Sequence, residues 1–115
     1  MPSMTNFEFG DVVLVPFPFT DQSTTKKRPA VVISSSRYHL ERQDLLLLAI
    51  TSQIRPESRI GEMSIAHWHD AGLIKPSVFK PLIATIDRNI VIRTLGSLVA
   101  ADREILQAVL KTILG

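Results

Sequence analysis

The chain has 115 residues, of which 45% are hydrophobic and 21% are charged. A chain of this length forms one compact core, and its composition is far from the polar, highly charged composition of disordered chains. It contains no cysteine, which excludes disulfides, thiolate nucleophiles and cysteine-bearing zinc sites. We therefore expect a single domain over residues 1–115, in which residues 1–6 form a loose leader.

The positive charge is more informative in its distribution than in its sum. The formal net charge is only +2, but Lys26, Lys27 and Arg28 are consecutive and are expected in a loop. A solvated surface explains such a cluster about as well as a polyanion partner does. The longest apolar run, residues 45–50, is too short to cross a bilayer, and residues 1–9 lack a signal-peptide pattern. These features indicate a soluble, cytoplasmic protein without a membrane partner.

The first half of the chain alternates apolar runs with polar connections. Residues 9–15 predict a strand that ends at Pro16, because proline cannot join a central ladder. Residues 20–27 are polar without a hydrophobic period and predict a long loop. Residues 29–34 are β-branched and almost entirely apolar, which predicts a strand buried on both faces.

The middle of the chain predicts further short elements. Residues 34–44 are a polar connection with room for a helical turn, and residues 45–51 predict a second buried strand. Residues 61–65 predict a modest fourth strand, and residues 66–72 predict one helical turn closed by Gly72 in the left-handed conformation. The remaining predicted strands are residues 78–85 and 94–98.

The last segment predicts an amphipathic helix. Its apolar residues recur with the 3.6-residue helical period, at Ile105, Leu106, Val109, Leu110, Ile113 and Leu114. Five to seven short strands followed by one such helix predict a mainly β protein, a small and partly open barrel with the helix packed against it.

Two polar residues lie where buried strands meet polar loops. Arg28 precedes the strand at residues 29–34, and Thr51 ends the strand at residues 45–51. If these strands are adjacent and antiparallel, the two side chains converge. A guanidinium beside a hydroxyl makes a plausible phosphate clamp. On the pattern alone, a surface charge and a strand-ending hydroxyl are the more common explanation.

Six short motifs occur in an order that resembles the MazF/PemK toxin family over nearly the whole chain. They are GDVVLVPFPFTD, KKRPAVVIS, LLLLAITSQ, GLIKPSV, TID and GSL, followed by the terminal helix. Each motif alone is weak, but six in the right order and spacing are strong. The resemblance implies the SH3-like small barrel of the CcdB/MazF/PemK toxins, a homodimer, and a cognate antitoxin as partner. It also implies cleavage of single-stranded RNA without a metal or other cofactor.

The same resemblance implies roles for individual residues. Arg28 matches the family's catalytic arginine and Thr51 its catalytic hydroxyl. The implied mechanism activates the RNA 2′-OH to attack the adjacent phosphate, which leaves a cyclic phosphate and a 5′-OH. Arg28 would stabilise the phosphorane and protonate the leaving oxygen, while Thr51 would hold a non-bridging oxygen. The general base stays open. The expected RNA-binding residues are Phe19, Gln22, Lys26, Lys27, Ser52, Gln53 and Lys80.

This chain departs from the family pattern in two places. Many members carry Glu-Gln in the first loop, whereas this chain has Asp21 and Gln22 earlier in that loop. Many also carry an acidic residue followed by Gln before the TID motif, where this chain has Phe-Lys-Pro-Leu at residues 79–82. The acidic contribution is therefore missing from its usual place, and Lys80 is the candidate for a basic contact there.

Two other functions and one other site were compatible with the sequence. A CcdB-like toxin would bind DNA gyrase without nuclease activity, and a non-catalytic barrel would use the Lys26–Arg28 patch only to follow a nucleic-acid backbone. His67 and His69 alternate around Trp68, but no third metal ligand is apparent, and Trp68 is expected to pack on the core. His39 is expected in a loop.

Overall fold

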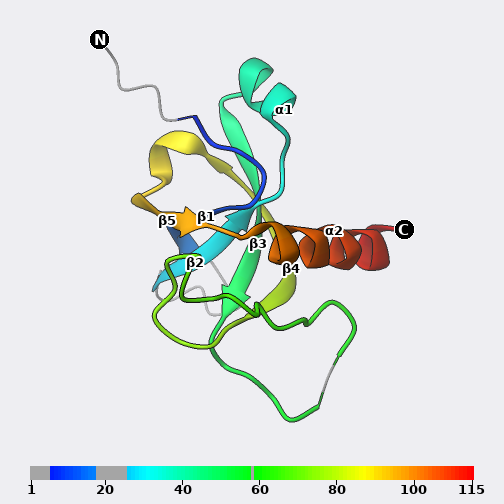
Figure 1. Ribbon diagram of the computed structural model, residues 1–115. Coiled ribbons are helices and arrows are strands. Elements are labelled where there is room, and N and C mark those ends of the chain that lie inside the picture. The colour runs from blue at the N-terminus through cyan, green and yellow to red at the C-terminus, as the bar shows by residue number, and fades with distance from the viewer. Residues whose placement is uncertain (1–5, 18–25, 58) are drawn as a thin grey trace.

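The structure is a computed structural model that describes residues 6–17, 26–57 and 59–115. It contains one antiparallel sheet of five strands in the order β4-β3-β2-β1-β5. Helix α2 follows the last strand and extends from the sheet to the C-terminus (Figure 1). The elements are β1 (Asp11–Phe17), β2 (Lys26–Val32), α1 (Ser36–Glu41), β3 (Asp44–Thr51), β4 (Val78–Asp87), η1 (Arg88–Ile90), β5 (Arg93–Ser97) and α2 (Ala100–Leu114).

The strands bury side chains on both faces of the sheet. Alternation along each strand sends Val12, Val31, Leu48 and Ile50 to one core cluster, which also contains Leu106 and Val109 of α2. A second cluster on the other face is built around Val13, Val15, Ala30, Val32, Leu45, Leu47 and Ala49. The continuous apolar runs of β2 and β3 are needed because both of their faces are covered. This confirms the expectation that these strands are doubly buried.

Two of the prolines in strands, Pro16 and Pro81, occupy positions that need no backbone N–H. Pro16 belongs to β1 and pairs with Lys27, so the prediction that this strand stops before the proline was wrong. The β1–β5 ladder ends at Leu14, and beyond it that side of β1 is an open edge. Pro81 lies at the bulge of the edge strand β4, between the Leu48–Ile83 and Ala49–Lys80 pairs.

Several expected boundaries also change. Strand β2 begins at Lys26, so the basic cluster lies on a strand and not in a loop. Residues 61–65 form no strand and contribute only an isolated bridge between Ser64 and Val78. The fold class is confirmed as a mainly β sheet with a C-terminal helix. Among the described residues β4 and β5 do not pair, so the barrel is open.

The connection between β3 and β4 is attached to α2 by a buried carboxylate. Asp102, in the first turn of α2, is fully buried and accepts hydrogen bonds from the backbone N–H groups of Ala66 and His67, at 3.1 and 2.8 Å. Residues 66–72 form the expected single turn, in which the N–H of Ala71 donates to the carbonyl of His67 and Gly72 has a φ of +88°. These bonds fix Ala66 and His67 against α2. They therefore also restrain the preceding residues of the connection, which lie beside β4.

No helix in the described part of the chain is both long and apolar enough to span a membrane.

Candidate functional site

The register of β2 and β3 brings the two principal candidate residues together. Ala30 pairs with Ala49 in this antiparallel ladder. Arg28 and Thr51 each lie two residues beyond this pair, at the same end of the two strands. Since side chains alternate along a strand, both project from the same face as the two alanines. The sequence-based expectation that these strands are adjacent and antiparallel is thus confirmed.

Thr51 also lines a cleft of about 210 Å³ at this end of the sheet. Val78 is its partner on the neighbouring strand β4. The cleft is lined by Thr51, Gln53, Arg55, Arg59, Glu62, Val78 and Lys80. Three of these residues are cationic and one is acidic, so the cleft suits a phosphate-bearing ligand.

The hydroxyl of Thr51 is oriented by its own loop. Its Oγ1 accepts a hydrogen bond from the backbone N–H of Gln53 at 3.1 Å, while the side chain remains half-exposed. A hydroxyl that accepts from the backbone retains its own proton for donation to a ligand oxygen. Arg28 is also half-buried, and its Nε atom is buried.

The other predicted site residues fall into three groups. Gln53 and Lys80 line the cleft with Thr51. Lys26 and Lys27 are exposed at the start of β2, next to Arg28 in the chain, and Ser52 is exposed just after Thr51. Phe19 and Gln22 lie outside the described residues.

The structure adds Arg55, Arg59 and Glu62 to the candidate site. The sequence offered a weak signal for the arginines, which appeared only as scattered positive charge, and none for Glu62. All three belong to the long β3–β4 connection, which has no periodic pattern that would place its side chains. Only the fold brings them beside Thr51.

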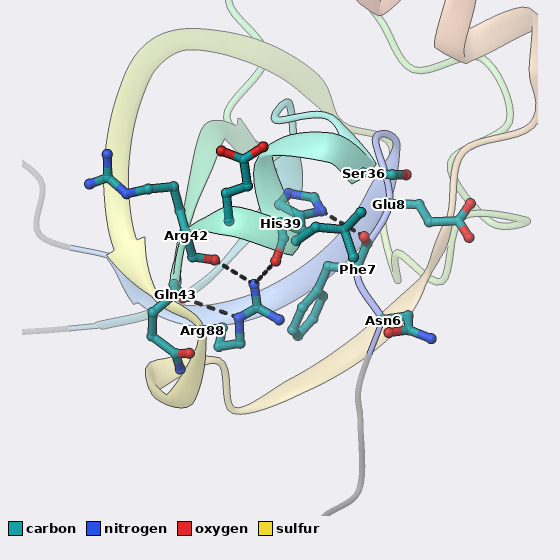
Figure 2. Close-up of a pocket in the computed structure, with 10 residues that line it drawn as sticks. Asn6, Phe7, Glu8, Ser36, His39, Arg42, Gln43 and Arg88 are labelled. Atoms are coloured by element: carbon teal, nitrogen blue, oxygen red, sulfur yellow. Dashed lines mark hydrogen bonds between the residues drawn. The ribbon is translucent and has the colours of Figure 1, made fainter.

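A larger pocket of about 590 Å³ lies between residues 6–8, α1 and Arg88 (Figure 2). Arg88 donates to the backbone carbonyls of His39, Arg42 and Gln43, which caps the C-terminal end of α1. Through these bonds the Arg88 guanidinium stabilises the C-terminal end of α1. The polar groups at the centre of this pocket therefore serve the fold.

His39 is buried on α1, so its expected place in a loop was wrong. Its Nδ1 lies 2.7 Å from the carbonyl oxygen of Phe7, which can only accept, so Nδ1 carries the proton. Nε2 is hydrogen-bonded to the Ser34 hydroxyl, whose oxygen also accepts from the N–H of Leu46. His39 is thereby hydrogen-bonded through both ring nitrogens, between the N-terminal segment and the sheet.

The histidines around Trp68 have local partners. Trp68 packs against the first core cluster, as expected. His67 lies 3.8 Å from a carboxylate oxygen of Asp70, and His69 contacts the Trp68 ring edge-on. Within the described ranges, no three His, Cys, Asp or Glu side chains gather in a way that could hold a metal ion.

The whole of this fold corresponds to a known protein family. Residues 8–114 match the family described as PemK-like, MazF-like toxin of type II toxin-antitoxin system. The chain belongs to this family. The match covers both arms of the candidate site, the Arg28 end of β2 and the Thr51 end of β3. No curated protein sequence matches this chain.

Solved structures with the same fold include PemK/MazF-type toxins from two bacterial groups. An endoribonuclease from a mycobacterial species is 17% identical, with a TM-score of 0.75 and coverage of 98% of this chain and 95% of that one. A mycobacterial endoribonuclease in complex with its cognate antitoxin is 15% identical, with a TM-score of 0.73 and coverage of 97% and 96%. The MazE-MazF structure (Form-III) from Deinococcus radiodurans is 22% identical, with a TM-score of 0.68 and coverage of 95% of each chain.

Proposed function

We propose that this PemK/MazF-like toxin is a metal-independent endoribonuclease that cleaves single-stranded RNA. The observation that carries the proposal is the antiparallel pairing of β2 and β3, which have Arg28 and Thr51 at the same end, where Thr51 lines a cationic cleft. Membership of the toxin family and the endoribonucleases among the structures of the same fold support it. The acting groups are an arginine and a hydroxyl, which need no metal to bind and polarise a phosphate.

The two catalytic residues have different tasks in this proposal. Arg28 forks two phosphate oxygens and stabilises the charge that develops on the phosphorane as the 2′-oxygen attacks. Thr51 donates its hydroxyl proton to a non-bridging oxygen, an orientation that the N–H of Gln53 favours. Lys26, Lys27 and Lys80 neutralise neighbouring phosphates. The products are a cyclic phosphate and a 5′-OH.

The partners follow from the family. A cognate antitoxin would occlude the cleft, as expected for a toxin whose structural relatives include MazE-MazF structures and a toxin–antitoxin complex. The active form would be a homodimer that works in the cytoplasm. Light scattering of the purified chain at micromolar concentration tests the dimer, and a monomer mass would contradict it.

Incubation with a long RNA of mixed sequence in excess EDTA tests the proposed activity. Cleavage into fragments that end in a cyclic phosphate and begin with a 5′-OH would support the proposal. Loss of cleavage in EDTA would refute metal independence. Binding of the RNA without turnover would favour a non-catalytic barrel, and inhibition of gyrase supercoiling without RNA cleavage would favour a CcdB-like toxin.

A further inference from the structure

The cleft contains one acidic side chain, and the sheet register places it. Ser64 forms a bridge with Val78, the residue that pairs with Thr51 on the other side of β4. The N–H of Phe79 donates to the carbonyl of Met63 at 2.9 Å, so the chain before Ser64 continues antiparallel to β4. Glu62 lies two residues before Ser64, and Lys80 lies two residues after Val78.

The same register defines the direction of the Glu62 side chain. Thr51 pairs with Val78, and Val78 forms the bridge with Ser64, so these three residues lie side by side. In extended backbone, side chains two residues apart point to the same face, which favours a common face for Lys80 and Glu62. This agrees with the lining of the cleft, which includes Thr51, Lys80 and Glu62.

The turn that ends at Glu62 packs closely against β4 and α2. The N–H of Glu62 donates to the carbonyl of Arg59 at 3.0 Å, which closes the turn. Gly61 has a φ of +87°, and a Cβ at this position would lie 3.0 Å from side-chain atoms of both Pro81 and Ile113. Because the backbone at Gly61 packs closely between β4 and α2, the position of the neighbouring Glu62 is restrained.

The charges around Glu62 belong to the same cleft. Arg55, Arg59 and Lys80 are the cationic groups that line it with the carboxylate. Among the seven described residues that line this cleft, Glu62 alone has a carboxylate, a side chain that can act as a general base. Neither a guanidinium nor a threonine hydroxyl is a convincing base. The geometry thus supplies a base where Arg28 and Thr51 do not.

We propose that Glu62 is the general base of the reaction, an inference that rests on the proposed ribonuclease function. Its carboxylate removes the proton from the RNA 2′-OH as the 2′-oxygen forms a bond to the adjacent phosphorus. The bond from phosphorus to the 5′-oxygen breaks, and the departing oxygen takes a proton from water at the exposed rim of the cleft. The resulting hydroxide collects the proton from Glu62, so the net products are the cyclic phosphate and the 5′-OH.

This assignment replaces the acidic contribution that the chain lacks before the TID motif. Lys80 occupies β4 in that stretch, and Glu62 lines the same cleft as Lys80. The cleft thus contains an acidic group from another part of the chain. Its source is the β3–β4 connection and not β4 itself.

The test compares Glu62→Gln with Glu57→Gln in the full-length protein. Glu57 lies in the same connection, is exposed and does not line the cleft, so its variant removes the same charge without removing the proposed base. We expect Glu62→Gln to lower kcat by roughly a hundredfold or more, with KM for RNA unchanged or lower, and Glu57→Gln to match the wild type.

The pH profile separates a base from a structural residue. The wild-type rate should fall at acidic pH as the carboxylate takes up a proton, and this limb should vanish in Glu62→Gln and persist in Glu57→Gln. Glu62→Asp should recover part of the rate together with the limb. A Glu62→Gln protein with the wild-type rate, or with a reduced rate and an unchanged acidic limb, would overturn the assignment.

The outcome is distinguishable from failure of the proposed function itself. If the wild type cleaves RNA in EDTA and Arg28→Ala does not, the ribonuclease function stands whatever the result for Glu62→Gln. If the wild type cleaves no RNA, the proposed function fails before Glu62 is tested. Circular dichroism of each variant verifies that lost activity does not reflect lost folding.

Discussion

The cleft at the end of β3 and the pocket around α1 use the same residue types for opposite purposes. In the α1 pocket, Arg88 donates to three backbone carbonyls (Figure 2), and His39 has partners on both ring nitrogens. In the cleft, the side chains of Arg55, Arg59 and Glu62 have no hydrogen-bond or ion-pair partner among the described residues. The polar groups of the larger pocket thus stabilise the fold. Arg55, Arg59 and Glu62 of the smaller cleft are available to bind a ligand.

The comparison shows that size does not identify the site. A polar group that is already satisfied by the backbone stabilises the fold and has little left to offer a substrate. Arg28 and Arg88 provide a test of this difference, because both are half-buried arginines from the molecule's two candidate regions. Substitution of Arg28 should lower the rate of RNA cleavage, and substitution of Arg88 should lower the free energy of unfolding.

The largest expected effect is that of Arg28→Ala. Loss of a well-placed donor to the transition state should lower the rate of RNA cleavage by roughly a hundred- to a thousandfold, about 3–4 kcal/mol. The midpoint of thermal unfolding should stay near that of the wild type, since no core cavity is created. Arg28→Lys should also be poor, because a point charge cannot fork two oxygens. A folded Arg28→Ala protein with full activity would show that the site is elsewhere.

Arg88→Ala should give the opposite result. Removal of its three hydrogen bonds leaves the carbonyls at the end of α1 without their cap and should lower the free energy of unfolding by about 2 kcal/mol. The rate of RNA cleavage by the folded variant should be unchanged. Guanidinium chloride denaturation measures the first quantity, and a large loss of kcat in the folded protein would contradict the division between the two regions.

Thr51→Ala should reduce cleavage less than Arg28→Ala does. A neutral hydroxyl contributes less than a charged fork, and Ser52 is available as a partial substitute, so we expect a loss of roughly tenfold in kcat. Single-turnover kinetics with saturating enzyme would measure this effect on chemistry directly. A loss as large as that of Arg28→Ala would assign the hydroxyl a more central role.

Lys80→Ala should have the smallest effect. We expect RNA binding to weaken a few-fold, with kcat nearly unchanged, because a single phosphate contact on an open surface is screened by salt. The difference from the wild type should shrink as the salt concentration rises in a binding titration. An effect independent of salt would indicate that Lys80 positions another residue of the cleft.

The parts of the fold that depend on local pattern were predictable. The apolar stripe of α2 and the doubly apolar runs of β2 and β3 appear as expected, and the Arg28–Thr51 convergence followed from pairing those two strands. Strand β1 continued through Pro16 because a free edge, which only the sheet order defines, tolerates a missing N–H. The burial of His39 was likewise invisible, since its partners lie on Phe7 and Ser34.

The sequence by itself determined the family, the fold class and the two residues at the ends of the buried strands, because strand periodicity and short motifs are local properties. Only the tertiary structure decided that Glu62 and Lys80 share a cleft with Thr51. Glu62 belongs to a connection without periodicity, whose path depends on the bridge between Ser64 and Val78 and on the anchor to Asp102. Such contacts join residues far apart in the chain, and their register follows from packing and backbone hydrogen bonds that no local pattern encodes.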